Sequence, residues 1–163
     1  TYETSDRACE TERANGVKSL TSNKDLVIFS GHGDPGGWCA TLDDWGLSGC
    51  PIDTIDFNNT RPIVIAFACQ TGNYAMVDSG GLNPSVATAF LKNNAALYFG
   101  STEASLCSHG AEMLEGKLWR YWTKRTRFGD TVFELKRWMV LNGGWDWTLY
   151  GFNLYGDPKF GGR

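Results

Sequence analysis

Three short runs of apolar residues constrain the fold of this chain more than any other feature. They are residues 26–29 (LVIF), 62–68 (PIVIAFA) and 95–100 (AALYFG), each about the length of one buried strand. Their apolar residues are continuous rather than alternating, which is typical of parallel strands whose two faces are both covered by helices. We therefore expect a mainly parallel sheet built from these three runs.

The segments between and after these runs predict the covering helices. A first helix fits residues 84–94, which begin with a Pro-Ser pair, and a longer one fits residues 109–124, where apolar residues recur on one stripe. Thr131 and Glu134 have the spacing of a capping box and predict the start of a third helix. The aromatic segment 145–160 predicts a final strand and turn. This order of strands and helices predicts an α/β fold.

Length, composition and charge limit the class of protein. An apolar content of 42% with 20% charged residues is typical of a globular chain and not of a disordered one. The net charge of −3 lacks the basic excess of nucleic-acid binders, and no apolar run is long enough to span a membrane. We expect a single domain over residues 1–163, in which the polar residues 1–24 form an N-terminal arm without a signal peptide.

The cysteine pattern argues against a structural metal site. The five cysteines are Cys9, Cys39, Cys50, Cys69 and Cys107. No CxxC pair is present, and the acidic residues between positions 43 and 56 lack the spacing of an EF-hand, so we expect no metal and no cofactor. Cys39 and Cys50 flank a short loop and could form a disulfide in an oxidising compartment; reduced cytosolic cysteines are the alternative. The sequence leaves the pairing open.

His32 and Cys69 carry the main functional signal. Each lies just past the end of a predicted strand, and His32 stands between two glycines. Because ligands of parallel sheets collect beyond the carboxyl ends of the strands, we expect the two side chains to face each other there. A cysteine beside a histidine base is a good nucleophile, and the neighbouring glycine frees an amide to bind an oxyanion. The alternatives are a turn histidine and a small buried cysteine.

Two residues near these motifs have open interpretations. Trp38 follows the glycine-rich stretch after His32 and either lines a substrate groove or packs against that stretch; packing is favoured because aromatic side chains dominate protein cores. His109 stands at a predicted helix start. We interpret it as a helix N-terminal residue or part of a pocket wall, rather than as a second base.

Several stretches together resemble the gingipain-type cysteine peptidases (family C25) of the caspase-like clan. DLVIFSGHGDPGGW resembles the histidine loop of that family, and PIVIAFACQTGNY resembles its nucleophile segment. The helix PSVATAFL, the strand and turn AALYFGSTEAS and the C-terminal FNLYGDPKF follow in the family's order, so the similarity covers about residues 16–160. The resemblance implies a caspase-like three-layer sandwich with a mainly parallel sheet. It also implies a cysteine endopeptidase that acts through a thioester acyl-enzyme.

The same resemblance implies roles for individual residues. Cys69 attacks the scissile carbonyl, His32 protonates the leaving amine, and the amides of Gly33 and Cys69 hold the oxyanion. The residues implied in substrate binding are Ser30, Gln70, Glu103 and Cys107. The expected partner is a polypeptide substrate.

The chain departs from the family pattern at its N-terminal side. The catalytic domain of the family has further strands before the histidine strand, whereas residues 1–24 are too few for two βα units. We therefore expect an incomplete sheet with residues 26–29 at its edge. The N-terminal part of the same processed precursor, present as a second chain, would complete it. We also expect a secreted or cell-surface protein.

Two other functions remain open at this point. A catalytically inactive member of the fold could bind peptides or serve as a structural subunit. A carbohydrate-binding module could use C-terminal aromatic residues such as Trp145 and Trp147, although aromatic residues two positions apart more often form one face of a strand.

Overall fold

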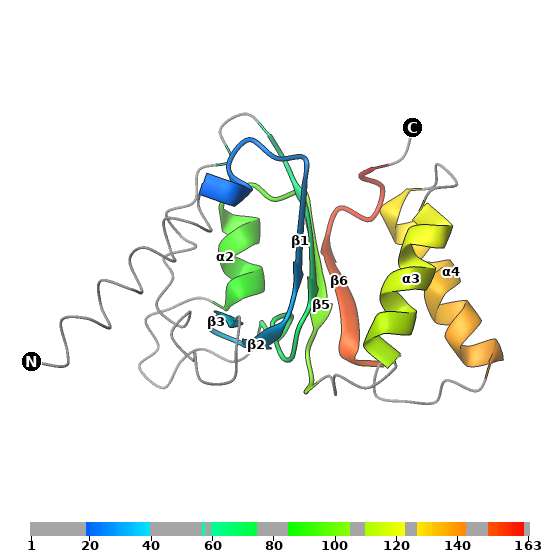
Figure 1. Cartoon of the computed structure of the whole chain (residues 1–163). Coiled ribbons are helices and arrows are strands. Elements are labelled where there is room, and N and C mark those ends of the chain that lie inside the picture. Colours follow the sequence, from blue (N-terminus) through cyan, green and yellow to red (C-terminus); the bar gives the residue numbers. More distant parts are fainter. Residues whose placement is uncertain are drawn as a thin grey trace, which may run out of the picture.

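The described part of the chain is a mixed α/β structure in three layers (Figure 1). A computed structural model describes residues 19–39, 57, 60–74, 85–104, 110–122, 127–142 and 150–161. Its strands are β1 (Leu26–Ser30), β2 (His32–Asp34), β3 (Gly37–Cys39), β4 (Ile63–Phe67), β5 (Leu97–Ser101) and β6 (Phe152–Gly156). Its helices are α2 (Val86–Lys92), α3 (Gly110–Trp122) and α4 (Phe128–Leu141).

The central sheet has the strand order β1-β4-β5-β6. β1 pairs with β4 and β4 with β5 in parallel, so that Leu26, Ile63 and Leu97 lie level across the sheet. β6 runs antiparallel to β5 and falls within segment 145–160, which predicts a final strand. The three strands expected from the apolar runs are confirmed, and so is the mainly parallel α/β sheet.

The two faces of the sheet bury alternate residues of β4 and β5. Toward α2, Val64 and Tyr98 pack in one apolar cluster with Phe90 of that helix. A second cluster lies between the sheet and the other two helices and includes Ile65, Phe67, Phe99, Leu118 and Leu135. The sheet is thus covered by α2 on one face and by α3 and α4 on the other, which is the three-layer sandwich that the resemblance implies (Figure 1).

The described helices lie where the sequence predicts helices. α2 is capped by Ser85, whose hydroxyl accepts a hydrogen bond from the Thr88 N–H at 3.3 Å, as expected of a serine at a helix start. α3 occupies the inner part of the predicted range 109–124. Among the residues described, no helix has the length and apolar character needed to cross a membrane.

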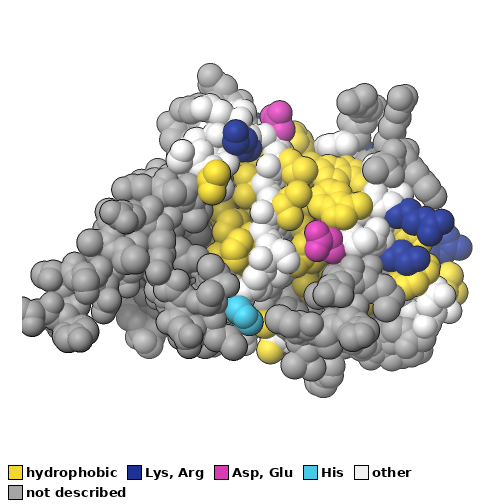
Figure 2. Space-filling view, in the orientation of Figure 1, with side chains coloured by type: hydrophobic (Ala, Val, Ile, Leu, Met, Phe, Trp, Pro, Cys, Tyr) yellow, Lys and Arg dark blue, Asp and Glu magenta, His cyan; other side chains and the backbone are white. Residues whose placement is uncertain are grey.

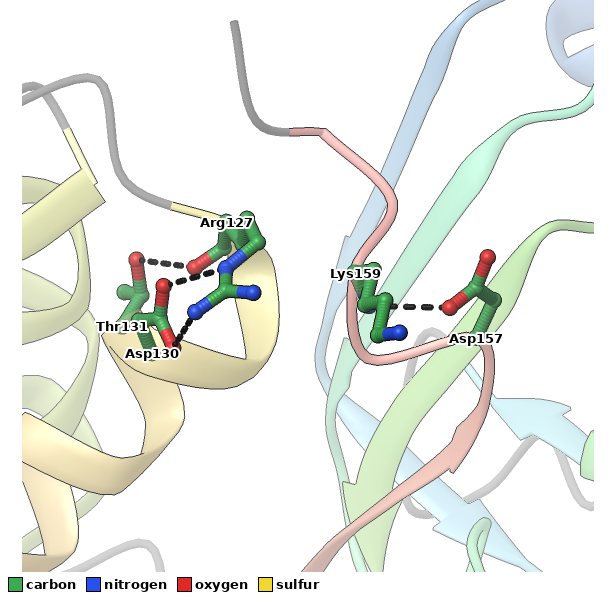
Figure 3. A network of polar contacts seen from close by, with 5 residues as sticks. All are labelled: Arg127, Asp130, Thr131, Asp157 and Lys159. Atoms are coloured by element: carbon green, nitrogen blue, oxygen red, sulfur yellow. Dashed lines mark hydrogen bonds and ion pairs between the residues drawn. The ribbon is translucent and has the colours of Figure 1, made fainter.

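α4 begins about one turn earlier than the capping-box spacing predicts, so that prediction is wrong. The helix is preceded by Arg127, whose guanidinium donates two hydrogen bonds to the Asp130 carboxylate, at 2.7 and 3.1 Å (Figure 3). Thr131 lies inside the helix, where it is buried and donates back to the Arg127 carbonyl at 3.3 Å. Thr131 therefore lies within the first turn and not at the N-cap position, and an acidic residue in the first turn suits the positive end of the helix dipole.

β1 lies at the edge of the described sheet and exposes apolar side chains. Val27 is buried toward α2, whereas Leu26 and Ile28, on the opposite face, are 37% and 45% exposed. α3 and α4 lie beside β6, at the other side of the sheet (Figure 1). Hydrophobic side chains are therefore visible on the molecular surface over the sheet (Figure 2).

Candidate active site

The segment after β1 forms a short hairpin at the carboxyl edge of the sheet. The Gly31 N–H donates to the Phe67 carbonyl at 3.2 Å, so the chain still follows β4 as β1 ends. β2 and β3 then pair antiparallel, and the Asp34 carboxylate accepts a hydrogen bond from the Gly36 N–H at 2.7 Å in the turn between them. We call residues 32–39 the histidine hairpin. The sequence suggests only a loop here; the structure shows two strands, because proline and glycine allow a tight turn.

Trp38 fixes the histidine hairpin against the core. Its side chain is 5% exposed and stacks on Phe29 of β1 and Phe90 of α2, with ring centroids 4.5 and 4.9 Å apart. The Pro35 carbonyl in the hairpin turn also accepts a hydrogen bond from the Val86 N–H, at the start of α2, at 2.9 Å. The packing interpretation of Trp38 is therefore confirmed, and the hairpin is held by both β1 and α2.

The segment after β4 carries Cys69 and forms a tight turn. We call residues 68–74 the cysteine loop. Gln70 in this loop has a left-handed backbone conformation (φ 54°), and its carbonyl accepts a hydrogen bond from the Asn73 N–H at 2.9 Å. The Cys69 side chain is half-buried and is a thiol rather than half of a disulfide. The loop therefore holds a thiol at the carboxyl end of a central strand, where ligands of such sheets collect.

The cysteine loop lies directly on the end of β5. The Gln70 N–H donates to the Glu103 carbonyl at 3.0 Å, and the Gly72 N–H donates to the Ser101 carbonyl at 2.7 Å. A Cβ atom on Gly72 would be 2.6 Å from the Gly100 carbonyl oxygen, so this approach requires glycine. The contact brings together Gln70 and Glu103, two of the residues expected to bind substrate.

Gly33 is the point at which the histidine hairpin meets the cysteine loop. A Cβ atom on Gly33 would lie 3.0 Å from the Cβ of Ala68 and 3.1 Å from the carbonyl oxygen of Cys69, and it would overlap the methyl group of Thr71. Glycine therefore lets the backbone beside His32 touch the backbone of Cys69. The structure brings both segments to one edge of the sheet, where the His32 side chain is half-buried.

The remaining residues expected around the substrate have different positions. Ser30 ends β1, two residues before His32, and is exposed. The Glu103 side chain is also exposed, and its backbone carbonyl accepts a hydrogen bond from the Ser101 hydroxyl at 2.9 Å. Cys107 lies outside the described residues, so the structure places only the beginning of the expected pocket wall.

Several other expectations also fall on residues outside the described part. They concern most of the N-terminal arm, the proposed disulfide of Cys39 and Cys50, the acidic segment 43–56, His109, and the aromatic residues Trp145 and Trp147. In the part of the chain that the structure does describe, no group of three or more His, Cys, Asp and Glu side chains could hold a metal ion.

Two buried hydroxyl groups near the site are not among the residues that the sequence singles out. Thr71 and Tyr98 are both 0% exposed, and their hydroxyl groups are hydrogen-bonded to each other. The Thr71 hydroxyl also donates to the Ala68 carbonyl at 3.3 Å, and the Trp38 indole N–H donates to the Tyr98 hydroxyl at 3.4 Å. Burial raises the pKa of Tyr98, so its hydroxyl stays protonated. A tyrosine inside the apolar run 95–100 is the available sequence signal, because a buried tyrosine usually needs a hydrogen-bond partner.

The chain matches a known protein family over almost its entire length. The family model that matches is that of peptidase family C25, and the match covers residues 2–161. A comparison with curated proteins finds no match. The matched range contains both the histidine hairpin and the cysteine loop.

Proposed function

The chain belongs to peptidase family C25, a family of cysteine peptidases, and we propose that it is an endopeptidase with Cys69 as nucleophile and His32 as general acid and base. The observation that carries this proposal is the contact at Gly33, which joins the histidine hairpin to the cysteine loop. A thiol and an imidazole at one site are suited to attack a peptide carbonyl near neutral pH.

The proposed reaction has two stages. The Cys69 sulfur attacks the carbonyl carbon of the scissile bond while the thiol proton passes to His32. The tetrahedral intermediate then expels the amine, which takes that proton from His32, and a thioester remains on Cys69. In the second stage, water attacks the thioester and gives a proton to His32. The carboxylic acid leaves, and the sulfur is protonated again.

We assign the negative charge of each tetrahedral intermediate to the amides of Gly33 and Cys69. In the histidine hairpin, Gly33 pairs with Trp38. The next pair toward the turn is Asp34–Gly37, which flanks the two turn residues. Hydrogen-bonded and non-hydrogen-bonded pairs alternate along an antiparallel ladder. We infer that the pair beside the turn is the hydrogen-bonded one, which leaves the Gly33 amide unused within the hairpin and available to an oxyanion.

The proposed substrate is a polypeptide that lies along the same edge of the sheet. We assign its binding to Ser30, Gln70, Glu103 and Cys107. Support comes from the exposure of Ser30 and Glu103 and from the hydrogen bond that joins the Gln70 backbone to the Glu103 backbone.

In Ser30→Trp, a bulky side chain beside the hairpin should raise KM for peptide substrates, and an unchanged KM would remove Ser30 from this set.

We further propose that a strand from the N-terminal part of the same precursor pairs with β1. β1 is the edge of the described sheet, and its Leu26 and Ile28 side chains are exposed. Natural proteins normally cover an apolar strand edge of this kind. Mass analysis of the native protein should reveal a second chain bound to this one. A folded monomer of 18.0 kDa would contradict the proposal.

Replacement of Cys69 tests the proposed function directly. Cys69→Ala should abolish both peptide hydrolysis and labelling by a peptidyl electrophile, because the variant lacks the attacking sulfur. Cys9→Ala removes a cysteine far from both motifs in the sequence and serves as the matched control; it should retain both properties. Full labelling of Cys69→Ala would refute the assignment of the nucleophile. A native protein that is neither active nor labelled would favour the alternative, an inactive member of the fold that binds peptides or has a structural role.

A further inference from the structure

Buried side chains join the histidine hairpin and the cysteine loop beneath the proposed site, and we propose that the Tyr98 hydroxyl sets the position of His32 relative to Cys69. This inference rests on the proposed function of those two residues. Tyr98 acts through Trp38 on one side and Thr71 on the other, so it is a positioning residue and not a catalytic one.

The first link connects the histidine hairpin to Tyr98. Trp38 lies in β3 of the hairpin, and its indole N–H donates to the Tyr98 hydroxyl at 3.4 Å. The indole ring is 5% exposed and stacks on the rings of Phe29 and Phe90, which limits its rotation. A movement of Tyr98 would therefore be transmitted to the backbone of the hairpin.

The second link connects Tyr98 to the cysteine loop. The Thr71 hydroxyl donates to the Ala68 carbonyl at 3.3 Å and is also hydrogen-bonded to the Tyr98 hydroxyl, so Thr71 links Tyr98 to the backbone of the cysteine loop. Thr71 also contacts the histidine hairpin directly, because its methyl group lies against Gly33. The hairpin and the loop are thus coupled by a contact between Thr71 and Gly33 and by a hydrogen-bonded path through Tyr98.

The surroundings indicate that this hydroxyl serves geometry more than stability. The buried residues around Tyr98 form an otherwise apolar cluster, in which phenylalanine could fill the same space. A buried hydroxyl is tolerated only when it is hydrogen-bonded, and no buried side-chain polar atom among the described residues lacks a partner. Hydrogen bonds are directional, so a fully satisfied buried network specifies one arrangement of the groups that it joins.

Three substitutions separate the hydrogen bonds from the packing. Tyr98→Phe removes only the hydroxyl, Thr71→Val keeps the shape of the side chain but not the hydrogen bond, and Thr71→Ser keeps the hydroxyl. Because a misplacement of about 1 Å can cost roughly a hundredfold in rate, we expect Tyr98→Phe and Thr71→Val each to lower kcat about tenfold while KM changes less than about twofold. Thr71→Ser should retain at least about half of the native kcat, because it preserves the hydrogen-bonded path.

A matched control distinguishes positioning from stability. Val132→Ala truncates a buried residue of the other apolar cluster and should lower the melting temperature without lowering kcat measured well below that temperature. A native kcat in Tyr98→Phe, or an equal loss of kcat in Val132→Ala, would overturn the positioning role. A native kcat in Thr71→Val would also overturn it, because the hydrogen bond would then be irrelevant. A native protein that does not hydrolyse peptides would instead overturn the proposed function.

Discussion

The carboxyl edge of the sheet and the helical layer of α3 and α4 are held together in different ways. At the edge, the histidine hairpin and the cysteine loop meet through close backbone contacts, as at Gly33, and through buried hydroxyl groups. In the helical layer, fully buried apolar side chains such as Leu118 and Leu135 fill the space against the sheet. We expect the first arrangement to fix the geometry of the proposed site and the second to contribute mainly to stability. Substitutions in the two regions should therefore separate activity from stability.

After Cys69→Ala, the largest effect on turnover is expected for His32→Ala. The variant lacks the group that we propose as the general acid and base, and such groups contribute a factor of about 10²–10⁴ to the rate. We expect kcat to fall by that factor while the circular dichroism spectrum is unchanged, because His32 is only half-buried. Hydrolysis at the native rate would contradict the catalytic role of His32. The edge of the sheet would then contribute to structure only, as the helical layer does.

A smaller loss of turnover is expected for Gly33→Ala. The added methyl group would collide with Thr71 and approach the Cys69 carbonyl oxygen to 3.1 Å, so the hairpin must move away from the cysteine loop. A shift of about 1 Å should lower kcat by roughly a hundredfold. Steady-state kinetics check this prediction, and a kcat within twofold of the native value would show that the close contact is not needed.

Leu118→Ala should have the opposite profile. Leu118 is fully buried between α3 and the sheet, and truncation of such a residue costs about 2–5 kcal/mol in the free energy of unfolding. Denaturant unfolding should show this loss, whereas kcat per folded molecule should stay native. A parallel loss of kcat would mean that the two regions are coupled and that the comparison fails.

The smallest effect is expected for Gly116→Ala, the matched control for Gly33→Ala. Gly116 lies on the exposed side of α3, and a Cβ atom added there would have no heavy atom within 4 Å. Alanine favours a helix over glycine by about 0.5–1 kcal/mol, so the free energy of unfolding should rise slightly and kcat should not change. A loss of activity here would show that Gly→Ala changes lower kcat for reasons unrelated to the site.

Part of the candidate site could be predicted from the sequence, because the sequence shows where the buried strands end. The continuous apolar runs that end before Gly31 and Cys69 identify two buried strands, and parallel pairing brings their carboxyl ends to one edge. That reasoning alone indicates that His32 and Cys69 share the edge.

The details that it missed depend on contacts between distant segments. The sequence shows that Tyr98 belongs to a buried strand, but not that its hydroxyl lies between Trp38 and Thr71, because these residues are far apart along the chain. The start of α4 was mispredicted for a related reason. Thr131 has the local spacing of a cap, yet it lies inside the first turn of α4, and the Arg127–Asp130 pair occupies the helix end instead.

Alkylation of Cys69 at pH 6 tests most directly whether His32 and Cys69 act as one unit. At this pH, an activated thiol reacts with iodoacetamide much faster than an ordinary one. We predict rapid modification in the native protein, located on Cys69 by mass spectrometry of the digested chain, and a clear slowing in His32→Ala. Equal rates in the two proteins would contradict the account, because the thiol would then react without help from the imidazole.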